Sequence, residues 1–393
     1  MQPMHTKLLA RIFIGISEAS QMVCTSVSVT LHAIKLLTAL AIGAAAGAPV
    51  TDLPGAPPNG TLSHHAGLLP VSFDEKRLEV FYYFVDHADA TAPLVVWMNG
   101  GPGASSMMGM FGELGPLLVN GRSLGPDGSV VSLWENAFSW SSGAALVAWE
   151  QPAGVGFSRC VDGPCDTWND TSSAAANVAI LEAFYGAHGT AQLRDLFIVG
   201  ESYGGVYVPM LAVGVLARGS ARLRGIGVGN GCIGFGVSGG CGTDSLDVLV
   251  SVLERLAPGV SRGALSDARA ACPGELDTGK APHELTPQCG AAMRDLFEEL
   301  GEYNQYHWAS ACGADGQGDW GAGDAFACAG GPLGGGVLPS YLARADVQRA
   351  LHVLGANEST PRKWVAWDGD WDGCMLHAEI QPTPSHSAHP QLV

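Results

Sequence analysis

The sequence predicts an α/β fold in which helices flank a central, mostly parallel sheet and a cysteine-rich helical cap is inserted into the core. Three observations support this prediction. Apolar runs typical of strands alternate with helical stretches from residue 66 to residue 229, a cysteine-rich stretch of different character follows, and 393 residues suffice for a large core with an insertion. Strands that alternate with helices favour a parallel sheet, because each helix carries the chain back to the same edge.

Five apolar runs are predicted to form the strands. Residues 78–84 (LEVFYYF) and 94–98 (LVVWM) are rich in β-branched and aromatic side chains, and Pro93 and Gly100 bound the second run. The preceding pair His64-His65 is expected to lie in an exposed loop. The other predicted strands are residues 144–149, 196–199 and 225–228.

Two helices are predicted between these strands. Residues 174–185 (AAANVAILEAFY) carry apolar side chains at the 3.6-residue spacing of a helix that packs on a sheet. A second apolar helical stretch, residues 206–216, comes shortly after the strand at 196–199. Residues 196–216 are therefore expected to form a strand, a tight turn and a helix in succession.

The chain changes character after residue 229. Residues 230–336 hold six of the ten cysteines and contain the predicted helices 246–256 and 291–303. The glycine-rich run 330–336 (GGPLGGG) ends this stretch, so we expect residues 230–336 to be a cap inserted between two parts of the core.

The core itself is expected to comprise residues 47–229 and to resume at residues 337–393. The second part begins with residues 340–353, which are predicted to be helical. A Pro/Ser/His-rich tail begins at Pro382, and no strand is expected in it.

The first 46 residues are predicted to be a signal peptide region. An apolar run, residues 36–46, follows Lys35 and ends in small residues that allow cleavage after Ala46. A bilayer span needs about 20 apolar residues, so no stable membrane span is expected once this segment is removed. Met1 and Met22 are alternative starts.

Composition narrows the function classes. The chain has 20 Lys and Arg residues and 37 Asp and Glu residues, so its net charge is −17. A nucleic-acid partner is not expected, because binding nucleic acid needs a basic face.

Ten cysteines without a Cys-x-x-Cys pair argue for an oxidising compartment rather than a zinc site. Sequons at Asn59, Asn169 and Asn357 agree with secretion and with a glycoprotein. Cys160 and Cys165 flank a Gly-Pro turn and are expected to form a local disulfide.

The sequence Gly-Glu-Ser-Tyr-Gly at residues 200–204 lies where the predicted strand turns into the predicted helix. A serine in such a tight strand-to-helix turn projects from the carboxyl edge of the sheet, and the turn needs small residues around it. This arrangement is the nucleophile elbow of the α/β-hydrolase fold, and it predicts Ser202 as the nucleophile. The backbone N–H of Tyr203 is expected to supply one donor to the oxyanion.

Five blocks of sequence, taken in order and with their spacing, make the chain resemble the serine carboxypeptidases. The similarity covers about residues 50–376, and five ordered blocks are more specific than any single motif. The blocks are residues 97–106 (WMNGGPGASS), 111–116 (FGELGP), 150–158 (EQPAGVGFS), 200–209 (GESYGGVYVP) and 346–352 (DVQRALH).

The resemblance implies a serine-type carboxypeptidase that hydrolyses C-terminal residues from peptides or proteins through an acyl-enzyme on Ser202. No cofactor and no metal are implied. A secreted or vacuolar/lysosomal location is implied, and the oligomeric state is not indicated. The resemblance also implies that Gly101 supplies the second oxyanion donor. The residues that it implies for binding the free carboxylate of a substrate's C-terminus are Trp97, Asn99, Glu113 and Glu201.

The chemistry of two neighbouring carboxyl groups supports that last role. A carboxyl group hydrogen-bonds a substrate carboxylate only while it keeps its own proton. Crowding Glu113 against Glu201 raises the apparent pKa of the pair. Peptide binding is therefore expected to strengthen as the pH falls, and an acidic optimum is predicted for peptide hydrolysis.

One departure from the resemblance concerns a disulfide. The resemblance implies a cysteine where this chain has Ala104, bonded to a cysteine at the place of Cys328. Cys328 is therefore expected to be unpaired, and removal of Cys24 with the signal region would leave an odd number of cysteines. Losing such a bridge costs about 2 to 5 kcal/mol in secreted domains, so lower stability is expected.

A second departure concerns the catalytic triad, which needs an aspartate and a histidine on late strands after the serine. Sixteen positions separate Asp370 from His386, and they include two prolines, so no strand fits between them. In one alignment Asp370 is the catalytic acid, whereas in another Trp371 to Cys374 form an element that precedes it. The weak triad candidates are Asp370, Asp372, His386 and His389.

Three interpretations of the chain therefore stay open. It is a truncated form of a carboxypeptidase, an acyltransferase on the same scaffold in which an alcohol replaces water, or a catalytically inactive relative that acts as a binding protein. Labelling of Ser202 by a fluorophosphonate distinguishes an activated serine from an inert one.

Overall fold

The computed structural model describes residues 47–366, except residues 58–62, 120–122, 124, 126–128, 131, 166, 233–245, 257–259, 277–284 and 301–336. Several residues singled out from the sequence lie outside this part of the chain, and the structure does not place them. They are the triad candidates Asp370, Asp372, His386 and His389, the cysteines Cys24 and Cys328, and the sequon at Asn59.

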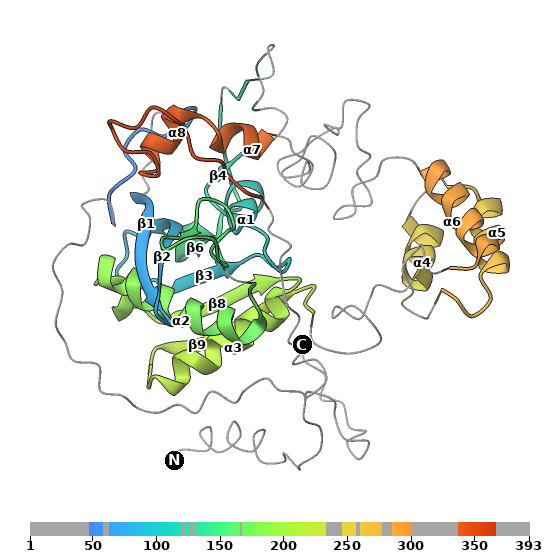
Figure 1. Ribbon diagram of the computed structural model, residues 1–393, viewed down its shortest axis with the longest axis horizontal. Helices are drawn as coiled ribbons and strands as arrows, with labels where there is room; N and C mark the ends of the chain where they lie inside the picture. Colours follow the sequence, from blue (N-terminus) through green and yellow to red (C-terminus); the bar gives the residue numbers. More distant parts are fainter. Residues whose placement is uncertain are drawn as a thin grey trace. The chain divides into compact units, whose positions relative to one another are not determined.

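A seven-stranded sheet forms the centre of the described core (Figure 1). Its main path runs in the order β1-β2-β6-β3-β8-β9, and β7 pairs with β2. The four strands β6, β3, β8 and β9 are parallel, whereas β1, β2 and β7 form an antiparallel group at one end. The strands are β1 (Ser63–Phe73), β2 (Lys76–Asp86), β3 (Leu94–Met98), β6 (Ala145–Trp149), β7 (Arg159–Cys160), β8 (Leu196–Glu201) and β9 (Leu223–Gly229).

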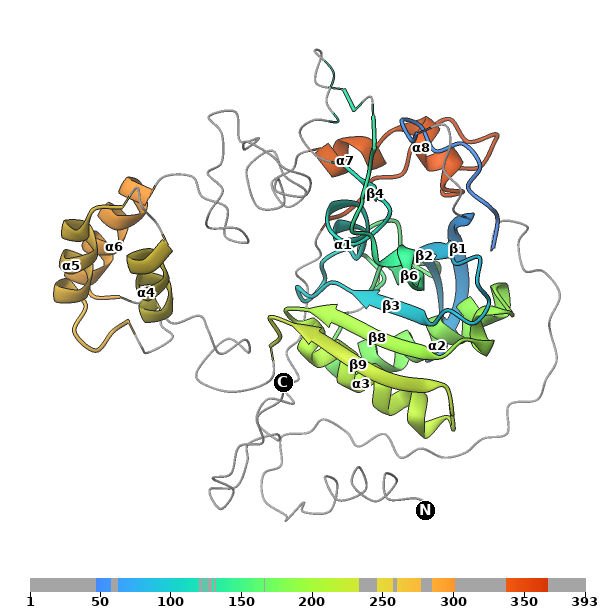
Figure 2. The same ribbon diagram turned by 180° about the vertical axis from the view of Figure 1, so that it is seen from behind.

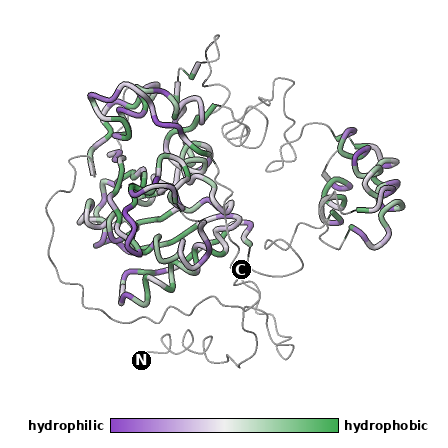
Figure 3. Tube along the Cα trace, viewed as in Figure 1, coloured by the Kyte–Doolittle hydropathy of each residue, from purple (hydrophilic) through white to green (hydrophobic). Residues whose placement is uncertain are grey.

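Helices cover both faces of this sheet, as Figures 1 and 2 show from opposite sides. On one face, α2 (Asp170–Ala187) and α3 (Gly204–Ala217) pack on alternate strand residues such as Val96 and Val147. On the other face, α1 (Met107–Gly112), α7 (Val337–Leu342) and α8 (Ala345–Ala350) pack on a second set that includes Trp97. Figure 3 shows the hydrophobic stretches running along the strands and these helices. The predicted α/β fold is confirmed.

The chain between these elements adds short pieces of structure. A two-stranded sheet joins β4 (Leu117–Leu118) to β5 (Trp134–Glu135), and two short 3-10 helices, η3 (Trp140–Ser142) and η4 (Ala191–Leu193), precede β6 and β8. The three helices α4 (Leu246–Leu256), α5 (Arg262–Ala271) and α6 (Pro287–Leu300) share a small apolar core of their own.

Two disulfides lie in the described part of the chain. The predicted local pair Cys160–Cys165 is confirmed. The second, Cys272–Cys289, joins the end of α5 to α6 within the cysteine-rich stretch, where the sequence left the pairing open. None of the described helices is long and apolar enough to cross a bilayer.

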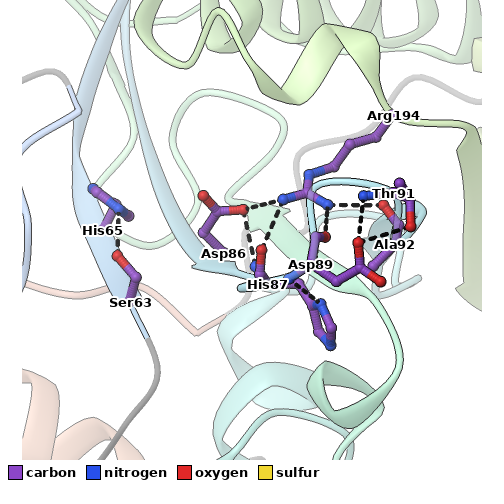
Figure 4. A network of polar contacts seen from close by, with 8 residues as sticks. All are labelled: Ser63, His65, Asp86, His87, Asp89, Thr91, Ala92 and Arg194. Atoms are coloured by element: carbon purple, nitrogen blue, oxygen red, sulfur yellow. Dashed lines mark hydrogen bonds and ion pairs between the residues drawn. The ribbon is translucent and has the colours of Figure 1, made fainter.

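A buried arginine fixes the turn that leads from β2 into β3 (Figure 4). The Arg194 guanidinium donates to the carbonyl oxygens of His87, Asp89 and Ala92 at 2.7 to 2.9 Å, and to Oδ1 of Asp86 at 2.8 Å. Because a buried charge is costly without partners, these four acceptors explain why an arginine is tolerated at this point.

The structure corrects the prediction of an exposed loop at His64-His65. Both residues lie in β1, which pairs with β2 over its whole length. His64 is half-buried, and its Nδ1 lies 2.7 Å from the hydroxyl of Tyr83. The two polar histidines made this segment look like a loop in the sequence. It is a strand because it pairs with β2, not because its own residues favour a strand.

The stretch 340–353, predicted to be helical, contains two short helices, α7 and α8, rather than one continuous helix. Arg344 is extended between them, with φ −70° and ψ 134°. Buried Gln348 donates to the Leu342 carbonyl oxygen at 2.9 Å and accepts from Arg362 N at 2.8 Å. A buried side chain thus replaces the helical hydrogen bond that the break removes.

Candidate active site

Ser202 lies in the turn between β8 and α3, in the place that the sequence predicted. Its φ is 53°, a left-handed conformation that non-glycine residues adopt mainly where the surrounding structure enforces it. Its N–H donates to the Gly229 carbonyl oxygen at 3.0 Å, and its carbonyl oxygen accepts from Gly205 N at 2.9 Å and Cys232 N at 2.8 Å. Ser202 is half-buried, so its side chain is held at the sheet edge and still reaches solvent.

Gly200, two residues before Ser202, must be a glycine because β8 lies close to β3 at this point. A Cβ on Gly200 would lie 2.5 Å from the Met98 carbonyl oxygen, a backbone atom that cannot move aside. The strand β8 can therefore turn into α3 beside the end of β3 only with glycine at this position.

The loop after β3 lies directly against the nucleophile turn. A Cβ on Gly100 would lie 2.4 Å from Tyr203 N and 2.9 Å from Ser202 Cβ. Gly101 follows with a φ of 115°, which favours glycine. The structure thus brings the two segments that carry the candidate oxyanion donors, Gly101 and Tyr203, side by side at Ser202.

A hydrogen-bonded chain connects the indole of Trp97 to the residue before the nucleophile. Trp97 Nε1 donates to Asn99 Oδ1 at 2.7 Å, and Gly109 N donates to the same oxygen at 3.0 Å. These two donors fix the orientation of the Asn99 amide, whose Nδ2 donates to Glu201 Oε1 at 2.9 Å. Three of the four residues implied for carboxylate binding therefore form one network next to Ser202.

The fourth, Glu113, follows α1 and interacts electrostatically with Glu201. Burial of the carboxyl group and the charge of Glu201 raise the pKa of Glu113 to about 8, while a hydrogen bond from Asn99 opposes the shift. Burial also raises the pKa of Glu201, again opposed by Asn99. Glu113 nevertheless keeps an exposed surface, where solvent moderates the cost of its charge. The pair of carboxyl groups therefore holds at least one proton near neutral pH.

A third carboxyl group, Glu150, was not assigned a role from the sequence. It is fully buried at the end of β6 and accepts from Ser105 Oγ at 2.7 Å, Trp364 Nε1 at 2.6 Å and Phe157 N at 2.5 Å. Burial raises its pKa to about 7, against the effect of these hydrogen bonds. Two signals in the sequence pointed to it: a charged residue directly after an apolar strand, and its position at the start of the block 150–158 that carries the family resemblance.

Glu150 therefore joins three segments that are distant in sequence. Gly156 leaves room for it, because a Cβ there would lie 1.7 Å from Glu150 Cδ. Backbone contacts also hold residues 364–366. Val365 forms an antiparallel β-bridge with Gly156, and Ser105 N donates to the Ala366 carbonyl oxygen at 3.0 Å. The loop after β3 is thereby tied to residues 364–366.

Comparisons with known proteins agree with the arrangement. The family model of the serine carboxypeptidases matches residues 54–382. The lysosomal protective protein of Mus musculus is 37% identical over 183 residues, which are 47% of this chain and 37% of that protein. Serine carboxypeptidase-like 36 of Arabidopsis thaliana is 37% identical over 186 residues, which are 46% of this chain and 37% of that protein. The matched part thus spans well under half the length of these relatives.

A solved structure shows the same fold. The prohormone-processing carboxypeptidase Kex1Δp from Saccharomyces cerevisiae is 23% identical, with a TM-score of 0.55 over 81% of this chain and 69% of that chain. This likeness and the parallel strands confirm the predicted α/β-hydrolase fold.

Proposed function

This chain belongs to the serine carboxypeptidase family, and we propose that it releases C-terminal residues from peptides through an acyl-enzyme on Ser202. The observation that carries the proposal is the continuity of the site. Glu201, which accepts from Asn99, is the residue directly before Ser202, and Asn99 is directly before the Gly100-Gly101 loop. A carboxylate bound at this network would therefore lie beside the nucleophile, as cleavage of a terminal peptide bond requires.

The proposed reaction begins with attack of Ser202 Oγ on the last peptide carbonyl. The N–H groups of Gly101 and Tyr203 stabilise the oxyanion that forms. A general base must take the Ser202 proton and return it to the leaving amine, after which water hydrolyses the acyl-enzyme. The histidines that the sequence offers for this step, His386 and His389, lie outside the described residues.

The substrate carboxylate is proposed to bind through a proton held by Glu113 and Glu201. In the protonated state Glu113 donates a hydrogen bond, and Asn99 and Glu201 lie next to it in the same network. Ionisation of Glu113 would instead place like charges together. The raised pKa of Glu113 supports stronger substrate binding at lower pH. The acidic optimum of hydrolysis stays a prediction.

Glu113→Gln is expected to remove most of the pH dependence of KM for a peptide with a free C-terminus. In the unaltered protein, KM should rise by about tenfold per pH unit once the pH exceeds the raised pKa of Glu113, because each unit lowers the protonated fraction tenfold. Glutamine keeps a donor at every pH, so the KM of the variant should stay flat. The measurement is KM between about pH 5 and pH 9.

The control for this experiment is the same peptide with a C-terminal amide. It lacks the carboxylate, so it should bind weakly to both proteins and show no such pH dependence. A Glu113→Gln variant whose KM follows the pH as in the unaltered protein would contradict the proposed role of Glu113.

A place in the secretory pathway is proposed on independent grounds. The disulfides Cys160–Cys165 and Cys272–Cys289 form in oxidising compartments. The sequon at Asn357 lies in an exposed turn, where a glycan would be accommodated. Expression in a secreting host should yield protein in the medium whose N-terminus follows Ala46, and retention of the first 46 residues would contradict this proposal.

A further inference from the structure

The oxyanion loop, residues 100–106, contains two glycines in the left-handed region on either side of Pro102. Gly101 and Gly103 both have positive φ, 115° and 81°, and glycine has more conformational freedom than any other residue. Within the loop, Ala104 N donates to the Gly100 carbonyl oxygen at 3.1 Å. The position of the Gly101 N–H therefore depends on what holds this loop from outside.

One outside contact comes from the helix that follows the nucleophile. Tyr207 lies on α3, five residues after Ser202, and is almost completely buried. Its hydroxyl accepts the N–H of Gly103 at 3.1 Å. Gly100 packs on Tyr203 N, just before α3, so the loop contacts the nucleophile turn at Gly100 and α3 at Gly103.

The ring of Tyr207 is itself held in place. It packs edge-on against the ring of Tyr203, with centroids 5.3 Å apart, and the Tyr203 hydroxyl donates to Asp170 Oδ1 at 2.7 Å. Burial raises the pKa of Tyr207 far above its usual range, so its hydroxyl stays neutral. The acceptor that faces Gly103 is thus a fixed, uncharged group.

We infer that Tyr207 is a positioning residue for the oxyanion hole, because its hydroxyl sets the separation between the Gly101 loop and the Tyr203 turn. This inference rests on the proposed function. Both donors must lie about 2.7 to 3.1 Å from the developing oxyanion. A misplacement of about 1 Å costs up to about 10²-fold in rate, so loosening the loop should slow the chemical step. Binding of the substrate carboxylate, which uses other residues, should be retained.

Tyr207→Phe tests the inference, because it removes the hydroxyl and keeps the ring. We expect kcat for peptide hydrolysis to fall about tenfold, less than the loss of a whole donor, while KM stays within about twofold. The matched control is Tyr341→Phe, which removes the hydroxyl of another buried tyrosine, one that donates to the Pro54 carbonyl oxygen at 2.8 Å. Its kcat should be unchanged.

A second measurement keeps the inference independent of turnover. Amide hydrogen exchange of residues 100–106 in the resting protein should be faster in Tyr207→Phe than in the unaltered protein, and unchanged in Tyr341→Phe. If Tyr207→Phe keeps the original exchange and kcat, or if both variants alter them equally, the inference is wrong. A protein that hydrolyses no peptide contradicts the proposed function, and the exchange data then decide on Tyr207 alone.

Discussion

Gly100→Ala is expected to lower kcat by about 10²-fold or more. The added Cβ would lie 2.4 Å from Tyr203 N and 2.9 Å from Ser202 Cβ. Neither atom can rotate away, so the loop and the nucleophile turn must separate. Loss of a single oxyanion donor costs about 10² to 10³ in kcat, and this separation displaces both candidate donors relative to each other.

The measurement is kcat together with the melting temperature of the purified variant. Gly186→Ala is the matched control, because a Cβ on this glycine of α2 would meet nothing within 4 Å. It should leave kcat unchanged and stabilise the helix by about 0.5 to 1 kcal/mol. A folded Gly100→Ala protein with unaltered kcat would show that the loop does not contribute an oxyanion donor.

Glu150→Ala is expected to lower the free energy of unfolding by about 3 kcal/mol or more. The substitution leaves three buried donors, on Ser105, Phe157 and Trp364, without their acceptor, and each unsatisfied donor costs about 1 to 3 kcal/mol. It also opens a cavity beside Gly156. Glu150 joins the loop after β3 to residues 364–366, so the substitution should destabilise both of these segments.

Urea unfolding of the variant measures this loss. Glu182→Ala serves as the control, since Glu182 is exposed on α2 and forms an ion pair with the exposed Arg218, a type of pair that contributes about 0 to 1 kcal/mol. A Glu150→Ala protein as stable as Glu182→Ala would mean that the buried carboxyl group does not hold the three segments together.

The sequence predicted those parts of the fold and site that depend on local spacing. The turn at Ser202 follows from a strand, a glycine-bounded pentapeptide and an apolar helix within some 20 residues, and the structure has all three. The strands with clear apolar runs, such as β3 and β8, were also placed well. In each case the local sequence pattern is enough to identify the element, although contacts with Gly229 and Met98 then hold the turn in place.

Features that depend on distant contacts were not predicted. Glu150 acquires its partners from Ser105 and Trp364, the second of which is 214 residues away. The break between α7 and α8 depends on the buried amide of Gln348, and the strand at His64 depends on pairing with β2. No local pattern contains this information.

The assignment of Asn99, Glu113 and Glu201 came from family resemblance rather than from any local pattern. The structure adds the geometry that the resemblance lacks: an amide fixed by two donors, and a carboxyl group next to the serine. It also supplies a physical reason for pH-dependent binding, because burial and the charge of Glu201 raise the pKa of Glu113.

The central claim, that Ser202 is an activated nucleophile facing two backbone donors, is tested most directly by fluorophosphonate labelling of the folded protein followed by mass spectrometry of its peptides. We expect one adduct, on the peptide that contains Ser202, and its complete absence from Ser202→Ala protein with the same melting temperature. A well-folded protein that forms no adduct, or one whose adduct survives in Ser202→Ala, would contradict the claim.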